Sequence, residues 1–409
     1  MTQLLTANFF ENPYPCYEAL RENGPVHWSE EFCGGAWLLT DYEDVSYALS
    51  SPNFSCLRAG GWANSGDQGT GNQLRRFKKI FCRSLLFLDG RQHARLRKAT
   101  NAAFKPALVR LLRPMITDAV EALINKMETD EQTDFVESFA RQLPTTIITR
   151  MLGVPESDRA RFYQWSEQLA RFIGAPTPSL EFALEAQDGL LSLADYFQEL
   201  IAEKRERPAE DLVSALIAAE AQGQVLTTKE LLAQCCTLLF AGYETTRNLL
   251  GVGLYTFLRN PRQWKLLQEV PSLMYPAIKE LLRYDSPVQY TGRRVRHEVN
   301  LHGKTLRRGD LVIPLIGAAN RDPKKFRDPE RFDIQRNDGC HLSFGHGSHV
   351  CIGAALTYLE TEIAFSALIR HFPNIRLVED KPRWSKNAVY RSLSSLTIAV
   401  QDECHLVPA

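Results

Sequence analysis

The sequence predicts a mainly helical protein of the α+β class with small β-sheets. Apolar residues recur at three- and four-residue spacing over residues 107–126, 158–173 and 180–203, which is typical of amphipathic helices. Strand-like segments are few and short, and they lie at residues 36–39, 299–312 and 394–400. Because these segments do not alternate regularly with helices, a doubly wound parallel sheet is disfavoured.

The composition is that of an ordinary globular protein. The 409 residues include 48 basic and 48 acidic side chains, so the formal net charge is zero. A neutral chain has no general positive field for phosphate backbones, which argues against a nucleic-acid-binding role. The nine cysteines are odd in number and scattered without CxxC spacing, so they predict neither a disulfide framework nor a zinc site.

Nothing in the sequence indicates secretion or a membrane segment. No basic stretch followed by an apolar core opens the chain, and the longest uncharged apolar stretches fall short of the ~20 residues of a spanning helix. We expect one domain over residues 1–409, a cytoplasmic location and a monomer. The glycine-rich polar segment 59–71 fits a functional lid and a tolerated surface insertion equally well.

The longest predicted helix covers residues 229–259. Thr227 and Glu230 form a capping box at its start, and Pro261 follows its end. At 1.5 Å per residue this helix spans about 45 Å, enough to cross the molecule. Residues 231–243 carry no charge, so we expect most faces of the helix to be buried.

A functional segment is expected in the middle of this helix. A glycine, a carboxylate and two threonines inside a buried helix contradict local preferences, and such contradictions are typical of functional sites. The segment reads Ala241-Gly242-Tyr243-Glu244-Thr245-Thr246.

Cys351 lies in a segment with three closely spaced glycines, Gly345, Gly347 and Gly353, directly before a predicted helix over residues 352–371. A helix N-terminus lowers the pKa of a thiol, so Cys351 is expected to be a thiolate, either a nucleophile or a metal ligand. A lone cysteine is also commonly a small buried apolar residue. A hydrolase with His349 or His346 as the base is a further alternative, although a base two residues away is poorly placed. Iron coordination suits one thiolate flanked by glycines better.

The string Phe344-Gly345-x-Gly347-x-His349-x-Cys351-x-Gly353 resembles the haem-ligand signature of the cytochrome P450 family, in its soluble bacterial branch. The resemblance extends over nearly the whole chain. It implies the cytochrome P450 fold, with haem b between the long central helix and the helix after the cysteine loop. Cys351 would be the axial ligand of the iron, and no other metal is implied.

The same resemblance implies a monooxygenase that activates O2 with electrons from NAD(P)H. A ferredoxin or flavodoxin and its reductase would supply these electrons. A lipophilic small molecule, free or bound to a carrier protein, would be hydroxylated or epoxidised, in bacterial secondary metabolism. A peroxide-using or isomerase-type haem-thiolate enzyme and a non-catalytic haem sensor are the alternatives.

The segment around Glu244 resembles the oxygen-binding stretch of the family. Thr245 can donate a hydrogen bond to the carbonyl of Ala241, and Gly242 would leave room for a groove over the iron. The resemblance makes Thr245 and Glu244 the catalytic residues that deliver protons. The alternative is a kink packed with satisfied threonines.

Haem propionates need cationic partners. His93 and Arg97 lie four residues apart, on one helix face, and resemble the propionate clamp of the family. Arg293 and His349 would complete the clamp. The alternative is a solvated basic helix face. The resemblance gives four further haem contacts: Phe344, Gly345, Ala241 and Gly242.

Glu280 and Arg283 resemble a structural lock behind the haem, joined by Arg331 from a downstream segment. By itself such a pair is usually an exposed ion pair of small effect. An electron donor would dock on a local positive patch of Arg91, Arg95, Lys98, Lys324, Lys325 and Arg327. The predicted lining of the substrate cavity is apolar and consists of Phe172, Leu239, Tyr243, Val288, Tyr290 and Leu393.

Overall fold

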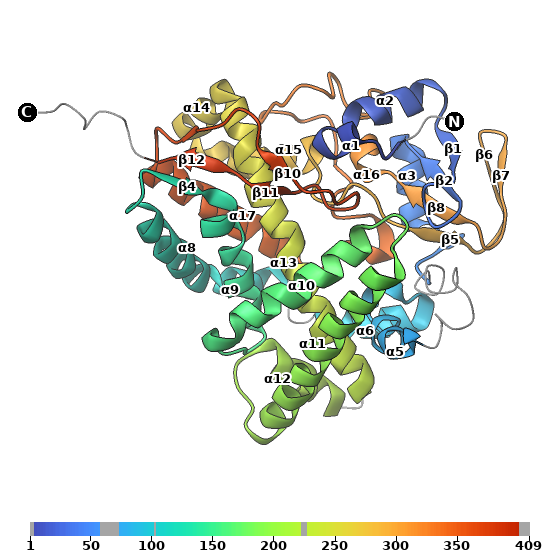
Figure 1. Ribbon diagram of the computed structural model, residues 1–409, viewed down its shortest axis with the longest axis horizontal. Helices are drawn as coiled ribbons and strands as arrows, with labels where there is room; N and C mark the ends of the chain where they lie inside the picture. Colours follow the sequence, from blue (N-terminus) through green and yellow to red (C-terminus); the bar gives the residue numbers. More distant parts are fainter. Residues whose placement is uncertain (1–3, 58–72, 102–103, 222–226, 401–409) are drawn as a thin grey trace, which may run out of the picture.

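The computed structural model describes residues 4–57, 73–101, 104–221 and 227–400 (Figure 1). The glycine-rich segment 59–71 lies outside these residues. The longer helices are α2 (Tyr14–Glu22), α3 (Tyr42–Ser50), α6 (Gly90–Asn101), α8 (Arg113–Met127), α9 (Gln142–Met151), α10 (Arg159–Gly174), α11 (Leu180–Glu206), α12 (Leu212–Ala221), α13 (Thr228–Arg259), α14 (Pro261–Glu269), α15 (Met274–Tyr284) and α17 (Ala354–His371). Short helices are α1 (Ala7–Glu11), α5 (Arg75–Phe81), α7 (Pro106–Leu111) and α16 (Ile316–Ala319).

Small sheets accompany the helices, as the sequence predicts. The largest has the order β1-β2-β8-β5-β3, with β2 and β8 parallel and the other neighbours antiparallel. Its strands are β1 (Val26–Ser29), β2 (Ala36–Leu39), β3 (Phe54–Ser55), β5 (Arg293–Val295) and β8 (Leu311–Pro314). The others are β4 (Gln132–Asp134), β12 (Thr397–Ala399) and β9 (Arg376–Leu377) in one sheet, β10 (Arg383–Trp384) with β11 (Leu393–Ser395), and the hairpin of β6 (Val299–Leu301) and β7 (Lys304–Leu306).

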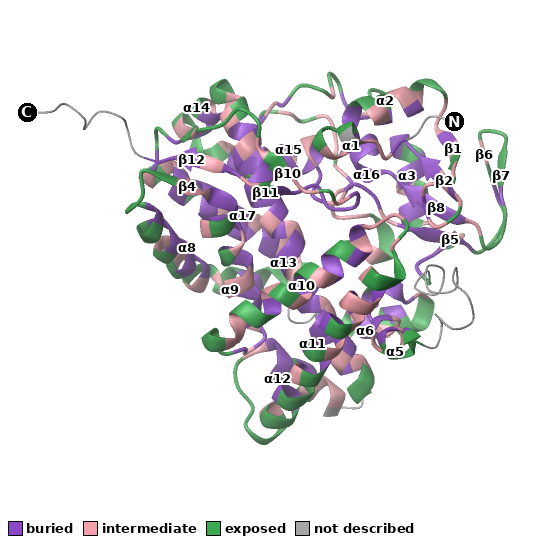
Figure 2. Cartoon of the chain, viewed as in Figure 1, coloured by how far each residue is buried: buried purple, intermediate pink, exposed green. Residues whose placement is uncertain are grey.

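The central helix α13 organises the molecule. Its capping box is formed, with the amide of Thr227 donating to Glu230 at 2.8 Å and the Glu230 amide donating to the Thr227 hydroxyl at 3.3 Å. Figure 2 shows that α13 is buried along most of its length. It packs against α9, α10, α11 and α17, and one hydrophobic cluster extends from Leu4 to Val400 around it. In the part of the chain that the structure describes, every helix is too short or too polar to span a bilayer.

Local exceptions to the predicted elements have physical reasons. The helix predicted over residues 107–126 is two helices, α7 and α8, because Pro114 lacks an amide donor and disfavours helical backbone before it. The strand predicted over residues 394–400 is divided at Leu396 into β11 and β12, which pair in different sheets. The hairpin predicted at His302 and Gly303 is present, but β8 leaves it to pair with β2 and β5.

The predicted lock is present with a different third member. Arg283 donates from Nε and Nη2 to the Glu280 carboxylate at 2.7 and 2.9 Å, and Arg336 donates from Nε to Glu280 at 3.1 Å. Arg331 does not occupy this place: its side chain is exposed, 3.8 Å from Asp333, and only its carbonyl accepts from Arg283 and Arg336. The sequence motif locates the segment correctly but does not fix which arginine turns inward.

Replacing Arg336 should therefore destabilise the protein far more than replacing Arg331. Arg336→Gln removes a charge-assisted hydrogen bond to a buried carboxylate and should lower the free energy of unfolding by about 1.5–3 kcal/mol. Arg331→Gln changes an exposed side chain and should stay within about 0.5 kcal/mol of the wild type. Urea denaturation measures both. Equal losses for the two variants would contradict this assignment.

Candidate active site

A cavity of about 400 Å³ lies between α13 and the loop that carries Cys351. Its wall is mostly apolar and includes Phe172, Val288 and Tyr290, as predicted from the sequence. The turn Leu85–Phe87, the loop between α10 and α11, and β8 contribute further side chains. Helix α17 starts directly after the cysteine loop and packs against α13. These elements, distant in sequence, therefore enclose one apolar chamber.

The glycines of the cysteine loop fix its shape. Gly345 and Gly347 adopt φ angles of +73° and +74°, a region that residues with a side chain rarely adopt. A Cβ on Gly347 would also lie 2.8 Å from the Cα of Ser50, so this glycine allows the loop to approach α3. The Cys351 amide donates to the Phe344 carbonyl at 2.7 Å, and Phe344, Gly345 and Cys351 all line the cavity.

Burial dominates the environment of the Cys351 thiol. Cys351 has exposed surface and lines the cavity, but the surrounding protein desolvates its sulfur. This burial raises the pKa of Cys351, and the amides of Gly353 and Ala354 and the charge of Arg97 lower it by less. The lowered pKa expected from a helix N-terminus is therefore wrong for the protein alone. A metal cation bound to the sulfur would still deprotonate it, because a coordinated thiol loses its proton outright.

One face of α13 lines the cavity, and it carries Ala241, Glu244 and Thr245. The Thr245 hydroxyl donates to the Ala241 carbonyl at 3.4 Å, as predicted, and the helix stays continuous through this stretch. Glu244 is 4% exposed; Asn248 Nδ2 donates a hydrogen bond to its carboxylate at 3.2 Å, and Arg247 forms an ion pair with it through Nη1 at 3.6 Å. Burial outweighs both neighbours and raises the pKa of Glu244. The carboxyl can therefore hold a proton beside the cavity.

Three residues predicted to face the cavity lie on the other side of α13, so these predictions are wrong. Gly242 does not line the cavity, since a Cβ there would lie 2.9 Å from Cδ1 of Ile148 on α9. Tyr243 is 2% exposed and packs edge-on against Tyr163, with ring centroids 5.8 Å apart. Leu239 is buried outside the cavity as well. At 3.6 residues per turn, these positions face away from Ala241 and its neighbours.

Leu393 is a fourth correction. It is 2% exposed and packed in the hydrophobic core, and it does not line the cavity. Val389 and Tyr390 line this part of the wall instead, and Leu238 takes the place predicted for Leu239. The sequence shows apolar residues in both segments. It does not show which of them face the cavity, because that depends on how each segment packs.

The predicted propionate clamp converges on the cavity. Arg97, Arg293, His93 and His349 all line it. Arg293 is 5% exposed and donates to the Gly292 carbonyl at 2.9 Å, and among the described residues no carboxylate forms an ion pair with Arg293 or Arg97. The buried Nε2 of His93 also has no hydrogen-bond partner. Buried cations without an anion are costly, so this wall suits a ligand with carboxylates such as the two haem propionates.

The two histidines of the clamp form a stacked pair. Their ring centroids lie 3.9 Å apart, with planes inclined by 30°. Burial and the neighbouring His349 lower the pKa of His93 to about 4. Burial also opposes charge on His349, but Asp89 and Cys56 outweigh it and raise the pKa of His349.

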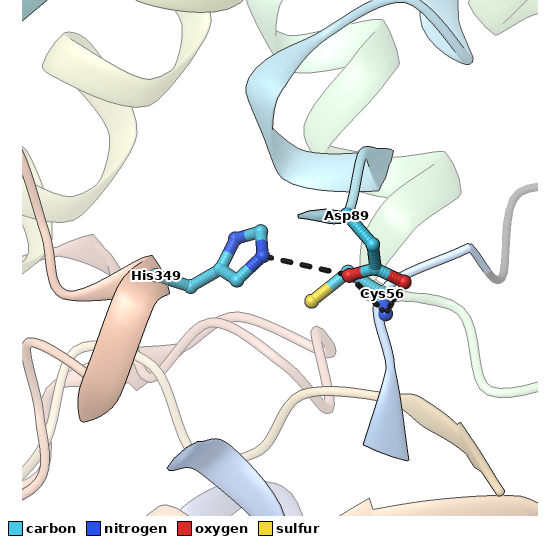
Figure 3. A group of neighbouring side chains, drawn as sticks. All are labelled: Cys56, Asp89 and His349. Atoms are coloured by element: carbon cyan, nitrogen blue, oxygen red, sulfur yellow. Dashed lines mark hydrogen bonds and ion pairs between the residues drawn. The ribbon is translucent and has the colours of Figure 1, made fainter. Parts of the chain in front are cut away.

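Sequence reasoning missed Asp89, which stands four residues before His93 in the same segment. The ligand atoms of Cys56, Asp89 and His349 lie within 4.8 Å of one another (Figure 3). The Asp89 carboxylate already accepts hydrogen bonds from the Ser55 hydroxyl and the Cys56 amide. These contacts hold the pKa of Asp89 well below its usual range, although burial acts in the opposite direction. The three residues therefore form a polar cluster that Ser55 and the Cys56 amide join through hydrogen bonds to Asp89.

The positive patch predicted for an electron donor is partly neutralised. Arg95 forms an ion pair with Glu230, Lys324 Nζ lies 2.8 Å from Asp41, and Arg327 Nε lies 3.8 Å from Asp328. The remaining members, Arg91, Lys98 and Lys325, form no ion pair among the described residues.

Comparison with known proteins identifies the family to which the chain belongs. The profile of the cytochrome P450 family matches residues 64–389. The chain is 37% identical to the cytochrome P450 monooxygenase PikC of Streptomyces venezuelae, over 96% of this chain and 92% of PikC. It is 35% identical to the polyketide biosynthesis cytochrome P450 PksS of Bacillus subtilis, over 96% of both chains. The crystal structure of P450BioI with a fatty-acyl carrier protein superimposes with a TM-score of 0.89 at 32% identity, covering 97% of this chain and 99% of that one.

The chain therefore belongs to the cytochrome P450 family and has its helix-rich fold with small β-sheets. It is a cytochrome P450 monooxygenase of the bacterial type, and several of its relatives act in secondary metabolism. Members of this family are haem-thiolate enzymes that receive electrons from redox partners.

The close approach of α13 and α9 at Gly242 can be tested by mutation. Gly242→Ala places a methyl group against Ile148 and should lower the free energy of unfolding by about 1–3 kcal/mol. Gly251→Ala is the matched control in the same helix, since its Cβ would meet Val136 at an ordinary 3.6 Å. The control should be neutral or stabilising by up to about 1 kcal/mol. Thermal unfolding that ranks the two variants in the reverse order would contradict this packing.

Proposed function

We propose that residues 1–409 form one domain that binds haem b through Cys351 and oxidises a lipophilic small molecule. The observation that carries the proposal is the shared cavity: the Cys351 thiol faces it from the cysteine loop, and two arginines without an ion-pair partner among the described residues, the buried Arg293 and the half-buried Arg97, also line it. When bound, the haem supplies reductive activation of O2, and its thiolate ligand favours O–O cleavage. Haem contacts are assigned to Phe344, Gly345 and Ala241 as well as to the propionate clamp.

Thr245 and Glu244 are the proposed catalytic residues. The Thr245 hydroxyl lies on the cavity face of α13, where it could turn from the Ala241 carbonyl and donate its hydrogen bond to a ligand in the cavity. Glu244 is buried one position earlier, and burial raises the pKa of its carboxyl, which favours a group that can hold and release a proton beside the cavity. Arg247 and Asn248 hold the carboxylate in place beside the cavity.

The proposed substrate is apolar because aromatic and aliphatic side chains dominate the distal wall, with Phe81, Phe87 and Phe172 among them. PksS is named for polyketide biosynthesis, and P450BioI was solved with a fatty-acyl carrier protein, so a polyketide-like or acyl substrate, free or carrier-bound, fits this family context. Electrons are proposed to come from NAD(P)H through a reductase and a ferredoxin or flavodoxin. We further propose a monomeric, cytoplasmic enzyme.

The haem assignment is tested on the purified protein by its absorption spectrum. Reduction under carbon monoxide should move the Soret band strongly to longer wavelength if the Cys351 thiolate holds the iron as proposed. Cys351→Ala should lose this shift. Cys340→Ala, which changes an exposed cysteine of the preceding segment, should keep it. A wild-type protein that stays colourless when supplied with hemin would refute the proposal.

The proton-delivery assignment is tested by the fate of the electrons. Thr245→Ala should still consume NADPH with its redox partners but should release most of the reducing equivalents as hydrogen peroxide, because the hydroxyl donor facing the cavity is gone. Thr256→Ala is the matched control, since Thr256 makes the same back-bond on α13, to Val252 at 2.8 Å, away from the cavity. Its peroxide yield per NADPH should equal that of the wild type. A wild-type ratio in Thr245→Ala would exclude this role and favour the peroxide-using or isomerase-type alternative.

A further inference from the structure

Asp89 lies where three segments that frame the cavity meet (Figure 3). Its carboxylate accepts hydrogen bonds from the Ser55 hydroxyl and, at 3.1 and 3.2 Å, from the Cys56 amide, both at the end of β3. Arg296, just after β5, approaches the same carboxylate at 3.3 Å through Nη2. On the remaining side, Nε2 of His349 lies 3.7 Å from the carboxylate. Four groups from three segments therefore hold one half-buried side chain in place.

Asp89 does not itself line the cavity, whereas His349 does. Contact between Asp89 and a ligand in the cavity is therefore indirect and runs through the imidazole. The His349 ring stacks on His93 from α6, whose buried Nε2 has no hydrogen-bond partner. Asp89 thus contacts His349, and His349 contacts His93. The last group of this chain of contacts is Nε2 of His93, which lies in the cavity wall and is free to donate or accept a hydrogen bond.

An imidazole turns readily about its terminal side-chain torsion unless a neighbour fixes it. For the His349 imidazole this neighbour is Asp89. The Asp89 carboxylate is rigid, because it accepts hydrogen bonds from backbone and side-chain donors of its own. Outer partners of this kind orient the groups that contact a cofactor, and their loss typically costs 10–100-fold in affinity.

We propose that Asp89 is a positioning residue for haem: it orients His349, and through the stacked ring His93, toward a propionate. The inference rests on the proposed function, in which haem occupies the cavity. Asp89 makes no contact with the cofactor or the substrate. Its role is to keep the two imidazoles of the clamp in a single orientation before the cofactor arrives.

The test measures haem release from the holoenzyme to excess apomyoglobin, followed by absorption. Asp89→Asn should release haem about tenfold faster than the wild type. Asp44→Asn is the matched control. Asp44 pairs with His302 at 2.8 Å and is about as buried as Asp89, with side chains 12% and 14% exposed, but it lies outside the cavity wall. This control should release haem at the wild-type rate.

A double-mutant cycle separates positioning from a general structural effect. If Asp89 acts through His349, the double variant Asp89→Asn/His349→Ala should release haem no faster than His349→Ala alone. Additive effects, or a wild-type rate in Asp89→Asn, would overturn the inference. Asp89→Glu keeps the carboxylate and should restore slow release to within a few fold. Should Asp89→Asn fail to fold, Ser55→Ala, which removes one bond that fixes Asp89, takes its place in the cycle with the same expectation.

Failure of the positioning role and failure of the proposed function give different results in these measurements. A wild-type protein that never takes up haem would remove the proposed function and this inference together. A wild-type protein that holds haem, with Asp89→Asn releasing it at the wild-type rate, would overturn only the positioning role.

Discussion

The rest of the site depends on two arginines without an anion, one buried and one half-buried, that face the same cavity. Arg97 on α6 and Arg293 on β5 face one cavity, and the described residues provide no carboxylate to neutralise either of them. Desolvating a cation is expensive, so a protein retains such an arrangement only where a ligand completes it. The two arginines therefore indicate that the ligand carries negative charge.

The rest of the site is arranged around the same chamber by the two faces of α13. Thr245 and Glu244 point into the cavity, and Gly242 and Tyr243 point toward α9 and α10. Side chains that line the cavity and side chains that pack against other helices thus lie within a single segment of six residues. The glycine serves close helix packing, which places the back-bonded Thr245 at a fixed depth in the chamber.

The cysteine loop illustrates how burial and local electrostatics compete. The amides that follow Cys351 favour a thiolate, but desolvation acts more strongly and keeps the pKa of the thiol raised. A sulfur in such a place is a poor free nucleophile and a good ligand, since a coordinated cation supplies the charge that solvent would otherwise provide. This balance argues against the hydrolase alternative on physical grounds.

The sequence by itself determined the features that depend on local chemistry. The glycine turn at Cys351, the capping box of α13, the back-bond of Thr245 and the spacing of His93 and Arg97 follow from residue types and helical periodicity, and the structure contains each of them.

Only the tertiary structure decided which side chains meet. It placed Arg336 rather than Arg331 on Glu280, turned Tyr243, Leu239 and Leu393 away from the cavity, and brought Asp89 against His349. These choices depend on the register of one segment against another, which is fixed by the packing of side chains distant in sequence and leaves no trace in the local pattern.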